Sequence, residues 1–160
     1  MDIKKIINPW VGEAQYNCFA CCPDNPIGLK MKFAEDGDYI VSKWMPSNDY
    51  MSWIDTLHGG IQAVLLDEIC GWVVSRKLRT AGVTSKMETR YRHPVRISCG
   101  EITLRAKIRE QRRNIIIIDA ELLDGNGVVC TEAVSTFFAF SREKAEKDML
   151  FRDFKVEGEE

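Results

Sequence analysis

Two groups that could do chemistry lie nine residues apart in the most apolar run of the sequence. His58, Gly59 and Gly60 open this run, and Asp67 lies inside it. A helix that starts at the glycines offers unpaired backbone N–H groups and the positive end of its dipole. A carboxylate in apolar surroundings has raised basicity. Together these groups predict chemistry in which N–H donors stabilise a developing oxyanion and a carboxylate acts as nucleophile or general base.

The spacing of these groups also predicts an oligomer. Nine residues along a helix correspond to about 13 Å, so one reacting carbon cannot lie within roughly 3 Å of both groups in a single chain. An antiparallel helix from a second copy would bring Asp67 of one chain to Gly60 of the other, and a two-fold axis does this twice. We therefore expect a homo-oligomer, either a dimer or a dimer of dimers.

Residues 56–79 are the predicted central helix that carries both groups. Its apolar residues cover every side, which is typical of a helix buried in a protein core. Asp67 and Glu68 interrupt the apolar run, so a membrane span is not expected. Each of these acids could instead lie at an exposed rim of the helix. Thr56 is the expected N-cap, and Gly82 is the expected end.

Alternating apolar residues predict strands on both sides of this helix. Two short strands joined by a turn at Asp36-Gly37 precede it, and four consecutive strands, expected to form a meander, follow it. We predict an α+β hotdog fold, in which a curved antiparallel sheet of about six strands wraps around the central helix. The expected strands are 29–33, 39–44, 84–91, 102–108, 115–123 and 128–140.

Length and composition favour one soluble domain. The chain has 160 residues, of which 45% are hydrophobic and 29% charged, with a net charge of −2. We expect a single domain over residues 1–160 with its core at about 17–140. Residues 1–15 are expected to form a short amphipathic helix, and the charged tail 141–160 to fray or lie on the surface. The net charge gives no general attraction to nucleic acid.

The six cysteines predict a reducing compartment rather than a disulfide framework. Their spacing is irregular and no apolar signal segment precedes them, so a cytoplasmic location is expected. Cys18 and Cys21 form a C-x-x-C with Cys22 adjacent, but a structural zinc site needs four ligands. No second pair of Cys or His stands nearby, because His58 and His93 lie elsewhere. We therefore expect a tight turn and no metal.

Two segments resemble a known family. HGGIQAVLLDEICGW, followed by Gly82-Val83-Thr84, resembles the hotdog acyl-CoA thioesterases of the PaaI-like, phenylacetate-degradation type. The upstream segment CFACCPDNPIGLKMKF is similar to the CFxCGxxNPxGL segment of one branch of these enzymes. The resemblance covers roughly residues 17–140. It implies hydrolysis of an acyl-CoA thioester to a free acid and CoA, with no cofactor beyond the CoA of the substrate.

The resemblance implies a role for each residue of the site. The backbone N–H of Gly60 or Gly59 would polarise the thioester carbonyl, and His58 would orient the loop or the substrate. Asp67 would act as nucleophile or general base. Thr84 matches the position of a Ser or Thr that positions the attacking water.

Substrate-binding residues are expected beside this machinery. Ser52 stands where many family members have Asn, and Glu68 is a second candidate acid. Arginines are dense on the later strands, and their guanidinium groups suit the phosphates of coenzyme A, although a solvated sheet face would also be rich in arginine. The arginines expected to bind substrate are Arg90, Arg92, Arg112 and Arg113.

Two other functions remain compatible with the sequence. One is a hotdog hydratase or dehydratase acting on acyl-CoA, which would need an Asp/His pair close in space. The other is a non-catalytic module that binds acyl-CoA and keeps the carboxylate only for structure. Measuring thioester turnover would distinguish a thioesterase from both of these alternatives.

Overall fold

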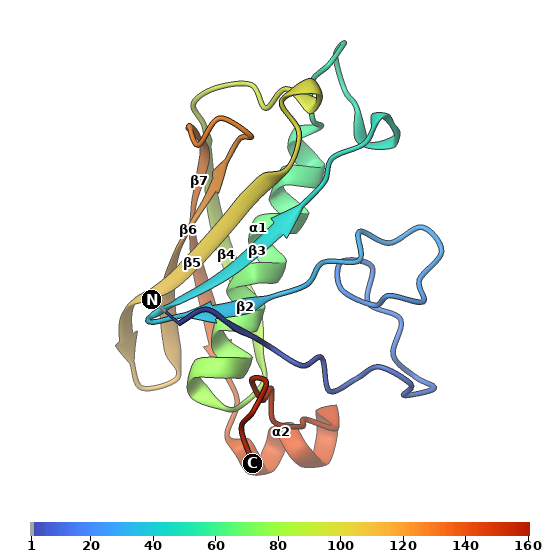
Figure 1. Cartoon of the computed structure of the whole chain (residues 1–160). Coiled ribbons are helices and arrows are strands. Elements are labelled where there is room, and N and C mark those ends of the chain that lie inside the picture. The colour runs from blue at the N-terminus through green and yellow to red at the C-terminus, as the bar shows by residue number, and fades with distance from the viewer. Residues whose placement is uncertain (1) are drawn as a thin grey trace.

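The computed structural model describes residues 2–160 as one antiparallel sheet curved around a central helix (Figure 1). The strand order across the sheet is β1-β2-β3-β5-β6-β7-β4. The predicted hotdog architecture is confirmed, with seven strands rather than about six. The strands are β1 (Lys4–Lys5), β2 (Ala34–Asp36), β3 (Tyr39–Trp44), β4 (Gly82–Tyr91), β5 (Ile102–Arg112), β6 (Ile115–Leu123) and β7 (Val129–Ala139).

The central helix is confirmed as the core element. α1 spans Gly59–Val73 and continues as a π-helical turn over Val74–Leu78. It contacts β3, β4, β5, β6 and β7, so the sheet surrounds it on several sides. Its fully buried side chains are Leu65, Leu66, Ile69, Cys70, Val73 and Val74.

Neither predicted capping residue is correct, although the predicted last residue of the helix, Arg79, is. His58 is the N-cap, while the Thr56 hydroxyl bonds backward to the Ile54 carbonyl and accepts from Arg96. The helix ends at Arg79, which adopts the left-handed conformation with φ of 54°. A helix can end on a non-glycine residue in this conformation when the surrounding structure holds it. Gly82 instead begins β4.

The predicted four-stranded meander is correct for only three strands. β5, β6 and β7 pair consecutively, but β4 pairs with β7, and β5 pairs with β3. The connection over residues 92–101 is long enough to cross from one side of the sheet to the other, with the 3₁₀ turn Ile97–Cys99 within it. As a result β4, which carries Thr84, lies at an edge of the sheet.

The strand predicted at 29–33 is also wrong, although its side-chain alternation is right. Leu29, Met31 and Phe33 are buried, but the backbone of this segment bonds to loops rather than to a strand. The N–H of Leu29 donates to the Phe19 carbonyl, and Ile6 donates to the Phe33 carbonyl. The hairpin turn itself is confirmed, since β2 and β3 pair around Gly37.

The two ends of the chain pack against each other. Residues 2–15 contain no helix, so the predicted N-terminal helix is wrong over the described residues; Met1 lies outside them. β1 pairs with β2, and Ile6 forms a bridge with Val156. The C-terminal segment forms α2 (Arg142–Met149) on the surface, as one of the expected outcomes, but Phe151, Phe154 and Val156 after it are buried.

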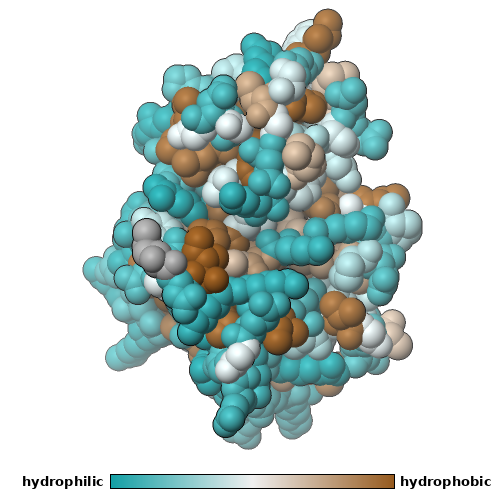
Figure 2. Space-filling model, viewed as in Figure 1, coloured by the Kyte–Doolittle hydropathy of each residue, from teal (hydrophilic) through white to brown (hydrophobic). Residues whose placement is uncertain are grey.

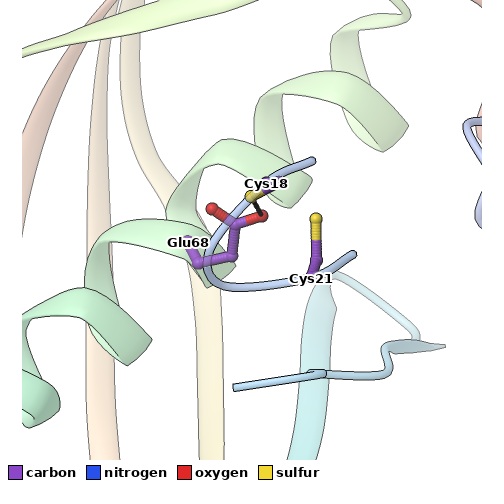
Figure 3. A group of neighbouring side chains, drawn as sticks. All are labelled: Cys18, Cys21 and Glu68. Carbon is purple, nitrogen blue, oxygen red and sulfur yellow. Dashed lines mark hydrogen bonds between the residues drawn. The ribbon is translucent and has the colours of Figure 1, made fainter. Parts of the chain in front are cut away.

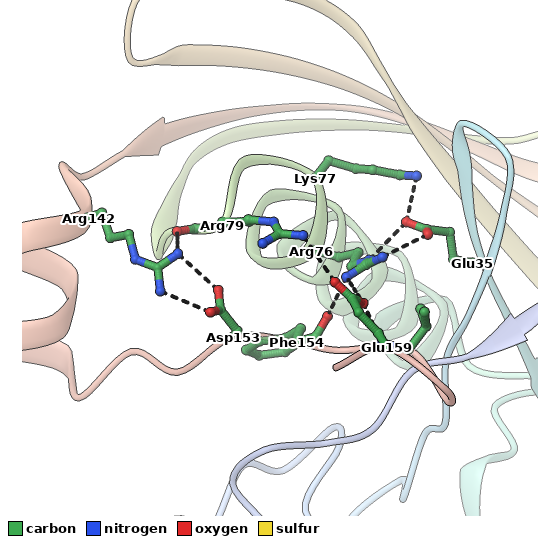
Figure 4. A network of polar contacts seen from close by, with 9 residues as sticks. Glu35, Arg76, Lys77, Arg79, Arg142, Asp153, Phe154 and Glu159 are labelled. Atoms are coloured by element: carbon green, nitrogen blue, oxygen red, sulfur yellow. Dashed lines mark hydrogen bonds and ion pairs between the residues drawn. The ribbon is translucent and has the colours of Figure 1, made fainter.

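An ion-pair network joins these ends to the end of the central helix (Figure 4). Arg76 donates to both carboxylate oxygens of Glu35 and to Glu159. Lys77 also donates to Glu35, at 2.7 Å. Burial pushes the pKa of Glu35 up, but hydrogen bonds from Arg76 and Lys77 outweigh it and hold that pKa below its usual value. The network fixes α1 relative to β2 and the C-terminal segment.

The outer surface is mostly hydrophilic on the side shown in Figure 2, with small separate apolar patches. No helix of the described residues is long and apolar enough to cross a membrane. All six cysteines are free thiols.

Candidate active site

The structure brings together the predicted acid and the predicted hydroxyl. Asp67 lies two turns into α1, and Thr84 lies near the start of β4. The Thr84 hydroxyl donates to Asp67 Oδ1 at 2.7 Å. A register shift in the pairing with β7 follows Thr84 directly, and such bulges re-aim side chains at a strand edge. The Thr84 hydroxyl holds the carboxylate. Because Asp67 is only half-buried and Thr84 is exposed, the carboxylate remains accessible from outside.

The start of α1 is organised by His58. Its Nδ1 accepts the backbone N–H of Gly60 at 2.9 Å, so the imidazole caps the helix. A side chain on Gly60 would place Cβ 3.0 Å from that nitrogen. Glycine at position 60 therefore leaves room for the cap.

Gly59 keeps an open N–H at the helix start. Among residues 2–160 its N–H has no hydrogen-bond partner, whereas the N–H of Gly60 is taken by His58. Of the two donors predicted from the sequence, Gly59 is thus the one available to a ligand. The helix dipole adds positive potential at this position.

Tyr91 is a site residue that sequence reasoning missed. Its hydroxyl donates to the Gly59 carbonyl at 2.7 Å, and its ring lies 3.3 Å from where a Cβ on Gly59 would be. Burial raises the pKa of Tyr91, so the hydroxyl keeps the proton it donates. Nothing in its sequence position marks this role, because the contact joins the last residue of β4 to the first residue of α1.

The structure does not bring Asp67 and the helix start together within one chain. Eight residues of continuous helix separate Gly59 from Asp67, which corresponds to about 12 Å of rise. β4 lies along the same side of α1 and touches both ends of this interval, through Thr84 and Tyr91. Asp67 and Gly59 are therefore two half-sites along one face.

Gln62 anchors the helix start from inside the core. Its amide donates to the Leu57 carbonyl at 3.1 Å, and its Oε1 accepts from the Thr131 hydroxyl at 2.5 Å. Gln62 and Thr131 are both buried. The two bonds tie the turn before His58 to β7, so they hold the glycines in place.

Ser52 and Glu68 lie apart from these half-sites. Ser52 is exposed in the turn before α1, where its N–H and hydroxyl bond to the Thr56 carbonyl. Glu68 accepts from the Trp72 indole at 3.1 Å and from the Cys18 thiol at 3.6 Å. It therefore points to the N-terminal segment, while its neighbour Asp67 points to β4.

The four predicted arginines divide between two ends of the sheet. Arg90 and Arg92 flank Tyr91 at the end of β4, and together they line a cavity of about 260 Å³ on the side of the sheet away from Gly59. Arg92 pairs with Glu132 at 2.7 Å. Arg112 and Arg113 lie at the β5–β6 turn, near the opposite end of α1. The four do not form one cluster within a chain.

The Cys18–Cys21 turn lies against α1 beside Glu68 (Figure 3). One ligand-type atom from each of Cys18, Cys21 and Glu68 lies within 4.8 Å of the other two. A hydrogen bond from Cys21 lowers the pKa of Cys18, and the pKa of Cys21 is raised, by that same bond and by burial. Cys22 turns away and donates to the Tyr16 carbonyl at 3.7 Å. The sequence-based count of Cys and His missed Glu68 as a third group at this turn.

Residues 54–131 match the family model of the thioesterase superfamily. The chain has the hotdog fold of that superfamily. No curated protein matches it significantly by sequence. One similar structure is a thioesterase superfamily protein with 22% identity and a TM-score of 0.70. The matched region covers 76% of this chain and 60% of that protein. This chain thus spans about 60% of the length of that protein.

In two further similar structures, the matched region covers a larger share of the other protein. A thioesterase from Haemophilus influenzae has 22% identity and a TM-score of 0.64, over 71% of this chain and 80% of its own. A hypothetical thioesterase from Streptococcus pneumoniae, solved with coenzyme A, has 23% identity and a TM-score of 0.61. The matched region covers 66% of this chain and 83% of that protein. At these identities the likeness establishes the fold.

Proposed function

We propose that this protein hydrolyses acyl-CoA thioesters at two equivalent sites, each shared between two copies of the chain. The observation that carries the proposal is the Asp67–Thr84 hydrogen bond at 2.7 Å on the face of α1 that also carries the open Gly59 N–H. A hydrolase needs a base or nucleophile and a donor for the oxyanion. Both groups are present on this face, but one reacting centre cannot reach both in a single chain.

In the proposed reaction the Gly59 N–H and the helix dipole stabilise the oxyanion that develops from the thioester carbonyl. Tyr91 positions this donor through the Gly59 carbonyl, and His58 positions it by capping Gly60. Asp67 of the second copy either activates a water or attacks the carbonyl carbon. Thr84 keeps its hydroxyl on Asp67 Oδ1, so that the other carboxylate oxygen faces the substrate.

The sheet edge supports a second copy at this position. β4 has an unpaired edge along the described chain, and Val83 beside Thr84 is an exposed apolar residue. Ile61 and Val64, on the first two turns of α1, are only half-buried in one chain. An exposed strand edge next to incompletely covered apolar residues is a surface that a partner stabilises. The proposed partner is an antiparallel second copy.

The pneumococcal structures add support for substrate and residue types. That protein was solved with coenzyme A, and its variants replace an aspartate or a threonine with alanine. By analogy, we propose that the substrate of this protein is a CoA thioester. We also propose that the protein belongs to the PaaI-like branch of these enzymes.

The decisive experiment measures thiol release from a panel of acyl-CoAs of different length and aromaticity. Asp67→Asn is expected to reduce kcat by about 10³-fold or more, since it removes the base or nucleophile. Glu68→Gln is the matched control, because this acid lies on another face of α1, and it is expected to keep kcat within about 3-fold. Equal losses in both variants, or a fully active Asp67→Asn, would refute the role of Asp67.

Sharing of the site is tested by mixing two inactive variants. Asp67→Asn supplies an intact helix start, and Gly59→Pro, which removes the proposed N–H donor at the first helical position, supplies an intact Asp67. Random re-association makes about half of the dimers mixed, each with one complete site, so activity is expected to recover to about a quarter of wild type. Mixed dimers verified by mass spectrometry with no recovered activity would place both groups in one chain's site.

A further inference from the structure

The turn at Cys18–Cys21 and the central helix place three metal-ligating groups together, on a side of α1 that the proposed hydrolase site does not use. We propose that Cys18, Cys21 and Glu68 bind one zinc ion or a similar divalent transition-metal ion. Fifty residues separate Cys18 from Glu68, so only the fold brings them together. The remaining position of a tetrahedral site would be taken by water.

The distances fit such an ion. Bond lengths of about 2.3 Å to sulfur and 2.0 Å to oxygen at a tetrahedral angle put a sulfur and an oxygen about 3.5 Å apart. Cys18 Sγ and Glu68 Oε1 are 3.6 Å apart. Cys21 Sγ lies within 4.8 Å of both, and Figure 3 shows the three side chains gathered around a common space. Only small side-chain movements would be needed to close the shell.

The charge of the Glu68 carboxylate is compatible with a cation at this position. Within residues 2–160, no Lys, Arg or His nitrogen lies within 4.0 Å of the half-buried Glu68 carboxylate. The carboxylate accepts from the Trp72 indole and from the Cys18 thiol, which is a weak donor. A bound divalent cation would displace the two thiol protons and offset two of the three negative charges of the carboxylate and the thiolates.

The surrounding groups are arranged as outer-shell donors. The Asn8 amide donates to the Tyr16 hydroxyl oxygen at 2.9 Å, so the Tyr16 proton is free to point at Cys21 Sγ, 2.8 Å away. Trp72 donates to Glu68 Oε1 in the same way. Ligating sulfur and carboxylate groups in metal sites are oriented by donors of this kind.

The ion would join the N-terminal segment to the helix that carries the hydrolase residues. Cys18 and Cys21 belong to the loop that precedes β2, and Glu68 belongs to α1. The loop already bonds to residues 29–31 through Phe19 and Ala20. The proposed ion would therefore link this layer to α1 through three protein ligands, and it would keep one position for water, unlike a four-ligand structural zinc site.

The test uses the full chain in a reductant that does not bind metals. Zinc is titrated in competition with a chromogenic chelator, and cobalt is added separately to look for thiolate-to-cobalt charge-transfer absorption. The wild type is expected to bind about one zinc per chain and to show that absorption. Cys18→Ala and Cys21→Ala are each expected to lose at least about 100-fold in zinc affinity, and Glu68→Gln at least about 10-fold.

Cys22→Ala is the matched control, since Cys22 is an adjacent buried thiol that turns away from the cluster. It is expected to keep the zinc affinity and the cobalt absorption of the wild type. A wild type that, under these reducing conditions, binds zinc no more tightly than Cys18→Ala overturns the proposal. Asp67→Asn is expected to bind zinc normally, so failure of the proposed hydrolase activity would leave this site standing.

Discussion

Replacing Thr131 with valine is expected to destabilise the fold by leaving a buried acceptor on the central helix without a donor. Valine has nearly the shape of threonine but no hydroxyl, so Gln62 Oε1 loses its partner while the packing stays almost the same. Both side chains are buried, with exposed fractions of 0% for Thr131 and 3% for Gln62. A buried polar group left without a partner costs about 1–3 kcal/mol. For a chain of this size, a loss of about 2 kcal/mol lowers Tm by about 4–8 °C.

The double variant separates this cause from a general weakening of β7. Gln62→Leu combined with Thr131→Val removes both partners and puts apolar groups in their place, which can be nearly neutral. We therefore expect the double variant to be more stable than the sum of the single losses predicts, by a coupling free energy of about 1 kcal/mol or more. Thr136→Val is the control, because Thr136 lies on the same strand and its side chain makes no hydrogen bond within residues 2–160.

Urea unfolding measures the single variants Thr131→Val and Gln62→Leu, the double variant and the Thr136→Val control. All are measured at one fixed protein concentration, since an oligomer's stability depends on concentration. The control is expected within about 0.5 kcal/mol of wild type. Strictly additive losses, or a Thr131→Val variant as stable as the control, would refute the reasoning that the Gln62–Thr131 bond holds the helix start to β7.

Two further predictions concern the helix ends. Tyr91→Phe is expected to lower kcat on acyl-CoA by about 10-fold, equivalent to about 1.4 kcal/mol, because the Gly59 carbonyl loses the hydroxyl that positions the donor; an unchanged kcat would contradict this. Glu35→Gln is expected to cost about 1–2 kcal/mol at pH 7. Hydrogen bonds from Arg76 and Lys77 lower the folded-state pKa of Glu35. The contribution of Glu35 to the free energy of unfolding is therefore fully present above the unfolded pKa of about 4.3 and is lost as the pH falls through the lower folded value. Urea unfolding should accordingly show the stabilities of wild type and Glu35→Gln converging below about pH 4.

The sequence predicts those parts of the fold that depend on local pattern. The central helix follows from an apolar run with no polar face, and the β2–β3 hairpin follows from Asp36-Gly37. Strand order does not follow in the same way. The alternation of residues 84–91 marks a strand but carries no information on which neighbour it pairs with, and the crossing connection at 92–101 moves β4 to β7.

Segments that pack through loops were the least predictable. The apolar residues of 1–15 have a helix-like spacing, yet their backbone bonds go to Phe33 and to the C-terminal segment, for example from Ile7 to the Lys155 carbonyl. Residues 29–33 alternate as a strand does, but the loop at Phe19 and Ala20 takes their hydrogen bonds. In both cases a partner distant in the sequence decides the conformation.

The candidate site divides in the same way. Asp67 is predicted from its place in the apolar run and Thr84 from a resemblance to a family, and the structure places the Thr84 hydroxyl 2.7 Å from Asp67 Oδ1. The capping of Gly60 by His58 required coordinates, because the same nitrogen could have faced a substrate. Tyr91 had no signal at all, since its role depends on where the end of β4 meets the start of α1.

Asp67 and Glu68 show why adjacent acids on a helix need not share a function. Successive residues on an α-helix are about 100° apart, so one step along the chain turns a carboxylate to a different neighbour. Asp67 meets the Thr84 hydroxyl at the open sheet edge, and Glu68 meets the Trp72 indole and Cys18 beneath the N-terminal segment. Glu68 therefore cannot stand in for Asp67 without rotating α1, and that rotation would break the Gln62–Thr131 bond.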